Sequence, residues 1–210
     1  MTVHLPYGFA TDGGTDTETN DGDAGGRLGA AIDPERDEPV ESLTDPTALR
    51  ARDDVTALEN TYTHENPDHC EATAAGRVVV GVTNDDGEAL LLVADERDHA
   101  MLPNTVVDAD EDWARAARSA VADGVDTSVR LDGVESVRTV EHVVEADGDT
   151  RHQNTTHHVL FHASPTDADV GGGPAVAQDG WHAGWYDELP VDPAVEDFED
   201  VIADIRMVLE

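Results

Sequence analysis

The most informative part of the sequence is LPNTVVDADEDWARAARSAVADGV, residues 102–125. Its first half is polar and acidic, whereas its second half repeats apolar residues at the three-to-four-residue spacing of a helix. The apolar residues that share one helix face are Trp113, Ala117, Ala120 and Val121. The sequence therefore predicts a loop that leads into a helix packed on a core through this face. Only the opposite face could carry chemistry, and it presents Asp112, Arg115, Ser119 and Asp123.

Apolar segments on both sides of this stretch are typical of strands. Residues 77–95, RVVVGVTNDDGEALLLVAD, contain two apolar runs around Asn84-Asp85-Asp86-Gly87, which predicts a hairpin. Because the runs 78–82 and 89–93 are continuously apolar, we expect strands buried on both faces. Further strands are predicted over residues 129–144, with a turn at Asp132-Gly133, over 155–164 as a central strand, and from residue 181 onward.

The two ends of the chain differ in character. Residues 1 to about 44 contain ATDGGTDTETNDGDAGG, which is acidic, rich in Gly and Thr, and almost without apolar residues, so the sequence predicts a disordered tail. Asp45-Pro46 supplies a helix N-cap and first turn, so we expect a helix to about residue 59 and a linker to residue 75. Residues 76–210 form the predicted folded domain. It ends in a helix, capped by Asp192-Pro193, whose apolar face is Val195, Phe198, Ile202, Ile205 and Leu209.

The charge is the most unusual feature of the composition. The net charge is −35, and all 12 basic residues are Arg. We interpret this as the acidic surface of a halophilic, archaeal-type protein, since molar salt screens self-repulsion beyond roughly 3 Å. Such a charge excludes nucleic-acid binding through a basic groove and opposes binding to anionic membranes. A polyanionic nucleotide would need a divalent metal as a bridge.

Cysteine and hydropathy give further expectations. Cys70 is the only cysteine, so the chain cannot form an internal disulfide. It lies in HENPDHCEA with His64 and His69, but two His and one Cys lack the paired spacing of zinc motifs, so a loop thiol is favoured. No apolar run reaches the roughly 18 residues of a membrane span, and no secretory signal pattern begins the chain. We therefore expect a cytoplasmic protein.

Residues 102–125 resemble the Nudix box, in which a glycine and a glutamate precede a helix that carries an arginine, three glutamates and a closing glycine. With Arg118 as the arginine, Asn104 falls at the first glycine, Asp110 at the first glutamate and Asp123 at the last glutamate. The two other glutamates and the closing glycine are replaced by Ser119, Ala122 and Val125. A second register, with two residues deleted after Asp123, uses Gly124-Val125 to close the box and puts Ala120 at the first helical glutamate. Neither register provides three carboxylates.

The resemblance extends over residues 77–190. GVTNDDGEALLLV is similar to the first hairpin of the Nudix fold, LPN to the family's LPGG, and WHAGWYDELP to its late strand. It implies a mixed α/β fold: a three-layer α/β/α sandwich with a mixed sheet. It also implies hydrolysis of nucleoside diphosphate-linked compounds with Mg²⁺ or Mn²⁺, which bridge the diphosphate and polarise the attacking water.

The resemblance also implies site residues. Arg118 would orient the carboxylates, Asp123 with Glu111 would hold the metal, and Asp110 would assist. Substrate contacts would come from Asn104, Ser119 and Trp185, and a base from outside the box could be Glu141, Glu145 or Glu188. Because the box has lost carboxylates, we expect weak or altered hydrolysis of a nucleotide-type small molecule. One alternative is a non-catalytic nucleotide-binding or protein-interaction module. Another is metal storage or sensing through strand histidines such as His158 and His162.

Overall fold

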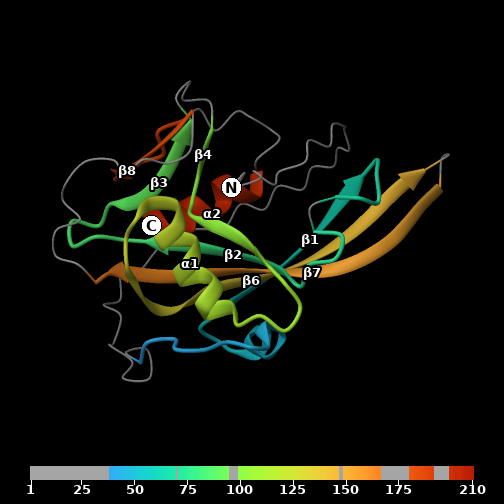
Figure 1. Cartoon of the computed structure of the whole chain (residues 1–210), viewed down its shortest axis with the longest axis horizontal. Coiled ribbons are helices and arrows are strands. Elements are labelled where there is room, and N and C mark those ends of the chain that lie inside the picture. Colours follow the sequence, from blue (N-terminus) through green and yellow to red (C-terminus); the bar gives the residue numbers. More distant parts are fainter. Residues whose placement is uncertain (1–37, 70, 95–98, 147–148, 167–179, 192–198) are drawn as a thin grey trace, which may run out of the picture.

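The structure is a computed structural model, and it describes residues 38–69, 71–94, 99–146, 149–166, 180–191 and 199–210 (Figure 1). The strands are β1 (Thr56–His64), β2 (Gly76–Val82), β3 (Ala89–Ala94), β4 (Ala100–Met101), β5 (Asn104–Val107), β6 (Val129–Ala146), β7 (Asp149–Pro165) and β8 (Trp181–Tyr186). The helices are the 3-10 helix η1 (Pro46–Ala51) and the α-helices α1 (Trp113–Val125) and α2 (Glu199–Leu209). None of the described helices is long and apolar enough to cross a membrane.

The strands form two sheets. The larger sheet has the order β1-β6-β7-β2-β5, and the smaller one has the order β4-β3-β8. In the larger sheet β1 pairs parallel with β6 and β2 pairs parallel with β7, whereas β6–β7 and β2–β5 are antiparallel. The prediction of a mixed α/β fold with a mixed sheet is therefore confirmed.

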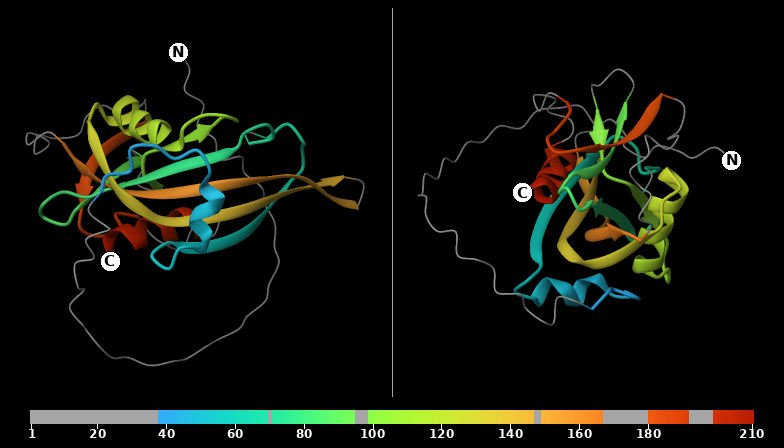
Figure 2. Two further views of the ribbon diagram at one scale, coloured as in Figure 1. Left: turned by 90° about the horizontal axis from the view of Figure 1, so that it is seen from below. Right: turned by 90° about the vertical axis from the view of Figure 1, so that its left-hand side faces the viewer.

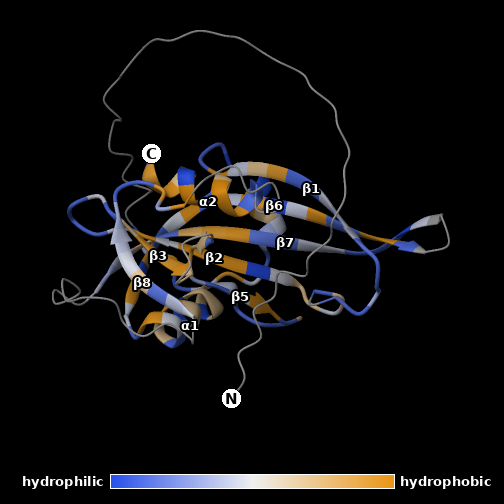
Figure 3. Ribbon diagram, turned by 90° about the horizontal axis from the view of Figure 1, so that it is seen from above, coloured by the Kyte–Doolittle hydropathy of each residue, from blue (hydrophilic) through white to orange (hydrophobic). Residues whose placement is uncertain are grey.

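One helix covers each side of the larger sheet, as the right-hand view of Figure 2 shows. Val78 and Val80 of β2 belong to the core under α1, and the intervening Val79 belongs to the core under α2. Because successive strand residues point to opposite faces, a strand between two helices needs apolar residues at every position. The prediction that residues 78–82 are buried on both faces is confirmed, and the apolar residues gather in β2, β3 and α2 (Figure 3).

Helix α1 forms as its sequence predicts. Asp112 is the N-cap, and its side chain accepts a hydrogen bond from the backbone N–H of Arg115 at 2.8 Å. This bond satisfies one of the free N–H groups of the first turn. The predicted apolar face is confirmed, since all four of its residues are buried: Trp113, Ala117, Ala120 and Val121.

The prediction of a helix from Asp45-Pro46 to residue 59 is wrong beyond its first turns. Asp45 does cap a helix, through a 2.9 Å bond from the N–H of Thr47, but this 3-10 helix ends at Ala51. The following residues form β1, in which every second residue is partly buried. Three of these partly buried residues are polar: Asn60, Tyr62 and His64. Because polar residues lie on both faces of β1, the hydropathy pattern does not predict the strand.

Two predicted turns have different outcomes. The turn at Asn84 is present, since the N–H of Gly87 donates to the Asn84 carbonyl at 3.0 Å and Gly87 has a φ of 80°. The turn connects β2 with β3, which belong to different sheets. A single isolated β-bridge, between Thr83 and Ala89, closes the turn. The turn predicted at Asp132-Gly133 is wrong, because β6 continues through it with a register shift between Leu131 and Gly133.

The described structure begins at residue 38, within the segment predicted as a tail. Residues 38–44, which the sequence assigns to the disordered tail, lie against the folded core, where Val40 N–H donates to the Leu131 carbonyl at 2.9 Å. Residues 1–37 lie outside the described residues. At the other end, Ile202 and Ile205 of the last predicted helix are buried as expected, while Val195 and Phe198 lie outside the described residues.

Candidate functional site

The acidic residues of the box lie at opposite ends of α1. Asp110 and Glu111 precede the helix, and Asp123 lies in its last turn. Ten residues separate Trp113 from Asp123, which corresponds to about 15 Å along the axis. Glu111 is engaged locally, because its carboxylate accepts from Arg115 at 2.9 Å and from the N–H of Asp108 at 3.2 Å. The structure therefore does not bring Glu111 and Asp123 to one ion.

Arg118 contacts the backbone that precedes the domain. Its guanidinium donates to the carbonyl of Val40 at 2.5 Å and to that of Glu41 at 3.2 Å. Asp112 reinforces this contact, because its carboxylate accepts from the hydroxyl of Ser42 and from the N–H of Leu43, the latter at 3.2 Å. Residues 40–43, which we call the N-terminal strap, are thus bound to the polar side of α1.

The three predicted substrate-binding residues lie on three different elements. Asn104 is in β5, where its carbonyl oxygen accepts from Arg77 at 2.8 Å and its amide donates to the Leu102 carbonyl at 2.9 Å. Ser119 is a half-buried residue of α1, and Trp185 of β8 packs against the apolar core beneath α1. Asn104 is therefore held inside the sheet by its own hydrogen bonds.

The box acids do not fit the metal site that the family resemblance implies. Among the described residues, one group of three potential ligands has all its ligand atoms within 4.8 Å of one another, and it contains His64, His69 and His142. None of the box acids belongs to it. Because Mg²⁺ and Mn²⁺ prefer several oxygen ligands around one ion, the described part of α1 offers no such centre.

A buried polar network lies on the α2 side of the larger sheet, with Glu71 at its centre. The Glu71 carboxylate, 4% exposed, accepts from Arg77 Nε at 2.9 Å, from Thr156 Oγ1 at 3.0 Å and from His158 Nε2 at 2.9 Å. Burial raises the pKa of Glu71, but hydrogen bonds from His142 and His158 and the charge of Arg77 outweigh it and leave the pKa far below its usual range. Glu71 is therefore an ionised buried carboxylate.

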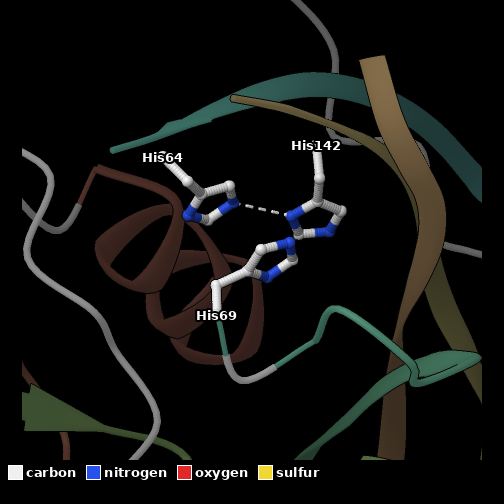
Figure 4. Close-up of side chains that lie close together, drawn as sticks. All are labelled: His64, His69 and His142. Atoms are coloured by element: carbon white, nitrogen blue, oxygen red, sulfur yellow. Dashed lines mark hydrogen bonds between the residues drawn. The ribbon is translucent and has the colours of Figure 1, made fainter. Parts of the chain in front are cut away.

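Three histidines extend this network toward the surface. His142 of β6 lies 2.9 Å from Thr156 Oγ1 through its Nε2, and 2.9 Å from His64 Nε2 through its Nδ1 (Figure 4). His69, in the loop that follows β1, stacks on His64 with ring centroids 3.9 Å apart. The pairing of β1 with β6 brings these residues together, because His64 lies beside Val144 in the register.

The histidine cluster was only partly visible in the sequence. His64 and His69 stood out beside Cys70, which lies outside the described residues. His142 is 78 residues from His64, and no sequence signal predicted that β1 pairs with β6. The sequence instead paired His158 with His162, but His158 is buried against Glu71 whereas His162 is exposed and bonds to Thr83 at 2.9 Å.

The network continues into α2 through ion pairs. Arg138 of β6 binds the carboxylate of Asp204 through two bonds, at 2.8 and 3.2 Å, and lies 3.6 Å from Asp200. Asp200 in turn accepts from the hydroxyl of Tyr62 at 2.7 Å. Burial raises the pKa of Asp204, while Arg138, whose own pKa is raised despite burial because Asp204 bonds to it, is a permanent cation. These contacts fix α2 to the polar half of the sheet.

Comparisons with known proteins give only a distant structural likeness. No family model matches the sequence, and no curated protein matches it. Among solved structures, a Nudix hydrolase from Nitrosomonas europaea aligns with 64% of this chain and 87% of its own, at 16% identity and a TM-score of 0.44. The chain resembles Nudix hydrolases distantly.

Two other structures give similar values. An Ap4A hydrolase from C. elegans aligns with 63% of this chain and 87% of its own, at 18% identity and a TM-score of 0.35. A MutT protein from Bacillus halodurans aligns with 64% of this chain and 82% of its own, at 13% identity and a TM-score of 0.39. At such TM-scores the likeness assigns neither activity nor substrate to this chain, so function has to be argued from its own residues.

Proposed function

We propose that this chain is a non-catalytic binding module on a Nudix-like scaffold, in which the box helix has a structural role. The observation that carries this proposal is the position of Arg118. Its guanidinium donates to the backbone carbonyls of Val40 and Glu41, so it holds the N-terminal strap. In a working box the arginine would instead orient metal-binding carboxylates.

The arrangement of the acids supports the same proposal. Asp123 is exposed, and Asp110 and Glu111 lie about 15 Å away at the other end of the helix. One divalent ion with metal–oxygen distances of about 2.0–2.6 Å cannot be held by both ends. Hydrolysis that depends on a box-bound metal is therefore not expected.

The ligand that we propose is the nucleotide-type small molecule implied by the family resemblance. With a net charge of −35, the protein repels free polyphosphate, so we expect such a ligand to bind together with its own divalent counter-ions. Binding should accordingly weaken when Mg²⁺ is withdrawn, even though the protein itself offers no site for that ion among the described residues of α1.

The proposal is tested by measuring turnover and binding on the same preparation. Phosphate release from ADP-ribose, Ap4A and nucleoside triphosphates is followed in concentrated KCl with Mg²⁺ or Mn²⁺, and binding of the same compounds by calorimetry. We expect binding without turnover. The variants are Asp123→Ala and, as a matched control in an exposed acid away from α1, Asp53→Ala.

Turnover by the wild type would overturn the proposal. If Asp123→Ala abolished that turnover and Asp53→Ala preserved it, the protein would be the weak hydrolase of the alternative prediction, with a metal at Asp123. Turnover unaffected by Asp123→Ala would move the catalytic acids to residues outside the box, such as Glu141, Glu145 or Glu188. Absence of both turnover and binding, in a protein shown to be folded, would reject the nucleotide as ligand.

A further inference from the structure

The histidine cluster has the arrangement of a metal site. His64 at the end of β1, His69 in the loop that follows β1, and His142 in β6 bring their rings close together (Figure 4). All three ligand nitrogens lie within 4.8 Å of one another, and His64 Nε2 lies 2.9 Å from His142 Nδ1. Around an ion with metal–nitrogen bonds of about 2.0–2.1 Å, two tetrahedral ligands are about 3.3 Å apart. The pair needs to separate by only a few tenths of an ångström.

His69 supplies an independent indication. Its Nδ1 accepts a hydrogen bond from the N–H of Glu71 at 3.3 Å. Its Nε2 is buried and has no hydrogen-bond partner among the described residues, and in Figure 4 it lies near the other two rings. Because Nδ1 accepts, a neutral His69 carries its hydrogen on Nε2. Coordination through Nε2 therefore requires that this hydrogen move to Nδ1, which gives up the long bond from Glu71 and leaves Nε2 with a lone pair for a metal ion.

The residues behind His142 hold its ring in the required orientation. Its Nε2 faces Thr156 Oγ1 at 2.9 Å and the Glu71 carboxylate at 3.5 Å. Both partners can accept a proton, and Thr156 itself donates to Glu71 at 3.0 Å. With the hydrogen on Nε2, Nδ1 carries the lone pair that faces His64. A carboxylate behind a ligating histidine fixes its tautomer and raises its basicity in metal sites generally.

Two further adjustments are needed before an ion can bind. With His142 Nδ1 as the acceptor, Nε2 of His64 carries the hydrogen of their 2.9 Å bond, so this hydrogen has to move to Nδ1 of His64. The second adjustment concerns the orientation of the rings. The rings of His64 and His69 are parallel within 2°, with centroids 3.9 Å apart. A metal lies in the plane of each imidazole that binds it, so one ion cannot satisfy two stacked rings. His64 is set by its strand, whereas His69 lies in a loop. We therefore expect the His69 ring to rotate when the metal binds.

We propose that His64, His69 and His142 form a three-histidine site for a transition-metal ion of the Zn²⁺ class, with Glu71 and Thr156 as positioning residues for His142. Three imidazole nitrogens favour Zn²⁺, Co²⁺, Ni²⁺ or Cu²⁺ over Mg²⁺ and Ca²⁺, which prefer oxygen. Three protein ligands also leave one coordination position open for water or an exogenous ligand. This inference is independent of the proposed function, because it uses none of the residues of α1.

The test is Zn²⁺ binding to the full-length chain without an affinity tag, after removal of metal with a chelator. We expect one equivalent of Zn²⁺ to bind and Mg²⁺ not to compete. His64→Ala and His69→Ala should each weaken binding by more than about tenfold, since even outer partners of metal ligands have effects of that size. His162→Ala, an exposed histidine bound to Thr83, is the matched control and should bind as the wild type does.

Three results would overturn the proposal. They are the absence of stoichiometric Zn²⁺ binding by the folded wild type, unchanged affinity in His69→Ala, and equal loss in His162→Ala. Co²⁺ substitution provides a second measurement that does not depend on affinity. Absorption bands of a tetrahedral nitrogen and oxygen site are expected, and a sulfur-to-cobalt charge-transfer band would assign the ion to a different ligand set. Circular dichroism of each variant tests whether it is folded. We expect His64→Ala and His69→Ala to fold, because both side chains are only half-buried.

Discussion

The ion pair between Arg138 and Asp204 gives the clearest test of how α2 is held on the sheet. Both side chains are buried, with 5% and 9% of their surfaces exposed, and two hydrogen bonds of 2.8 and 3.2 Å join them. Asp204→Ala leaves the Arg138 cation buried with Asp200 at 3.6 Å as its remaining carboxylate. Removing one member of a buried pair usually destabilises a protein by about 3–5 kcal/mol. Because Asp200 still lies near the Arg138 cation, we expect Asp204→Ala to lower the free energy of unfolding by about 3 kcal/mol, the lower end of this range.

Equilibrium unfolding in urea measures this effect, because urea leaves the ionic strength constant. With a denaturant slope of about 2 kcal/mol per molar, the midpoint should fall by about 1.5 M. Glu59→Ala is the matched control, since it removes an ion pair with Arg50 whose Glu side chain is 76% exposed, and exposed pairs contribute about 0–1 kcal/mol.

A double variant separates the charge effect from lost packing. Arg138→Met with Asp204→Leu replaces both ions by apolar side chains of similar size, and it should regain most of the lost stability. The reasoning is refuted if Asp204→Ala lowers the free energy of unfolding by less than about 1 kcal/mol, or by no more than the Glu59→Ala control.

Three further predictions concern pH, packing and salt. Burial first, and then the charge of Arg50, lower the pKa of His157 below 6.5. The unfolded chain therefore binds this proton more tightly, and stability should fall as the pH drops below about 6.5. His157→Gln should make the fall of the urea midpoint between pH 7 and 5 smaller, while His64 and His69, whose pKa values are also lowered, account for the remaining fall. A Cβ at Gly81 would overlap the methyl groups of Val208, so Gly81→Ala should lower the free energy of unfolding by about 1–3 kcal/mol. Adding Val208→Ala to the same chain should restore part of this stability, and thermal unfolding measures both effects. The net charge of −35 predicts a lower melting temperature in about 0.1 M than in about 3 M KCl, and equal values would contradict the halophilic interpretation.

The box motif predicted the local structure of α1 but not the contacts of Arg118. The spacing around Arg118 predicted a helix with an apolar face, and the structure has that helix with Trp113 and Ala117 buried. The same spacing predicted that Arg118 would orient carboxylates. Its contacts with Val40 and Glu41 come from a segment 77 residues earlier in the chain, and no local pattern in residues 102–125 encodes that partner.

Local sequence patterns were sufficient to predict three buried features: the apolar run of β2, the apolar face of α1, and Ile202 and Ile205 of α2. Hydrophobic periodicity reports which face of an element is buried, and it is readable one element at a time. The pairing of β1 with β6 depends on contacts between distant parts of the chain, because three of the four partly buried residues of β1 are polar and have partners far away in the sequence. The candidate metal site depends on that pairing, since it is what places His64 beside His142.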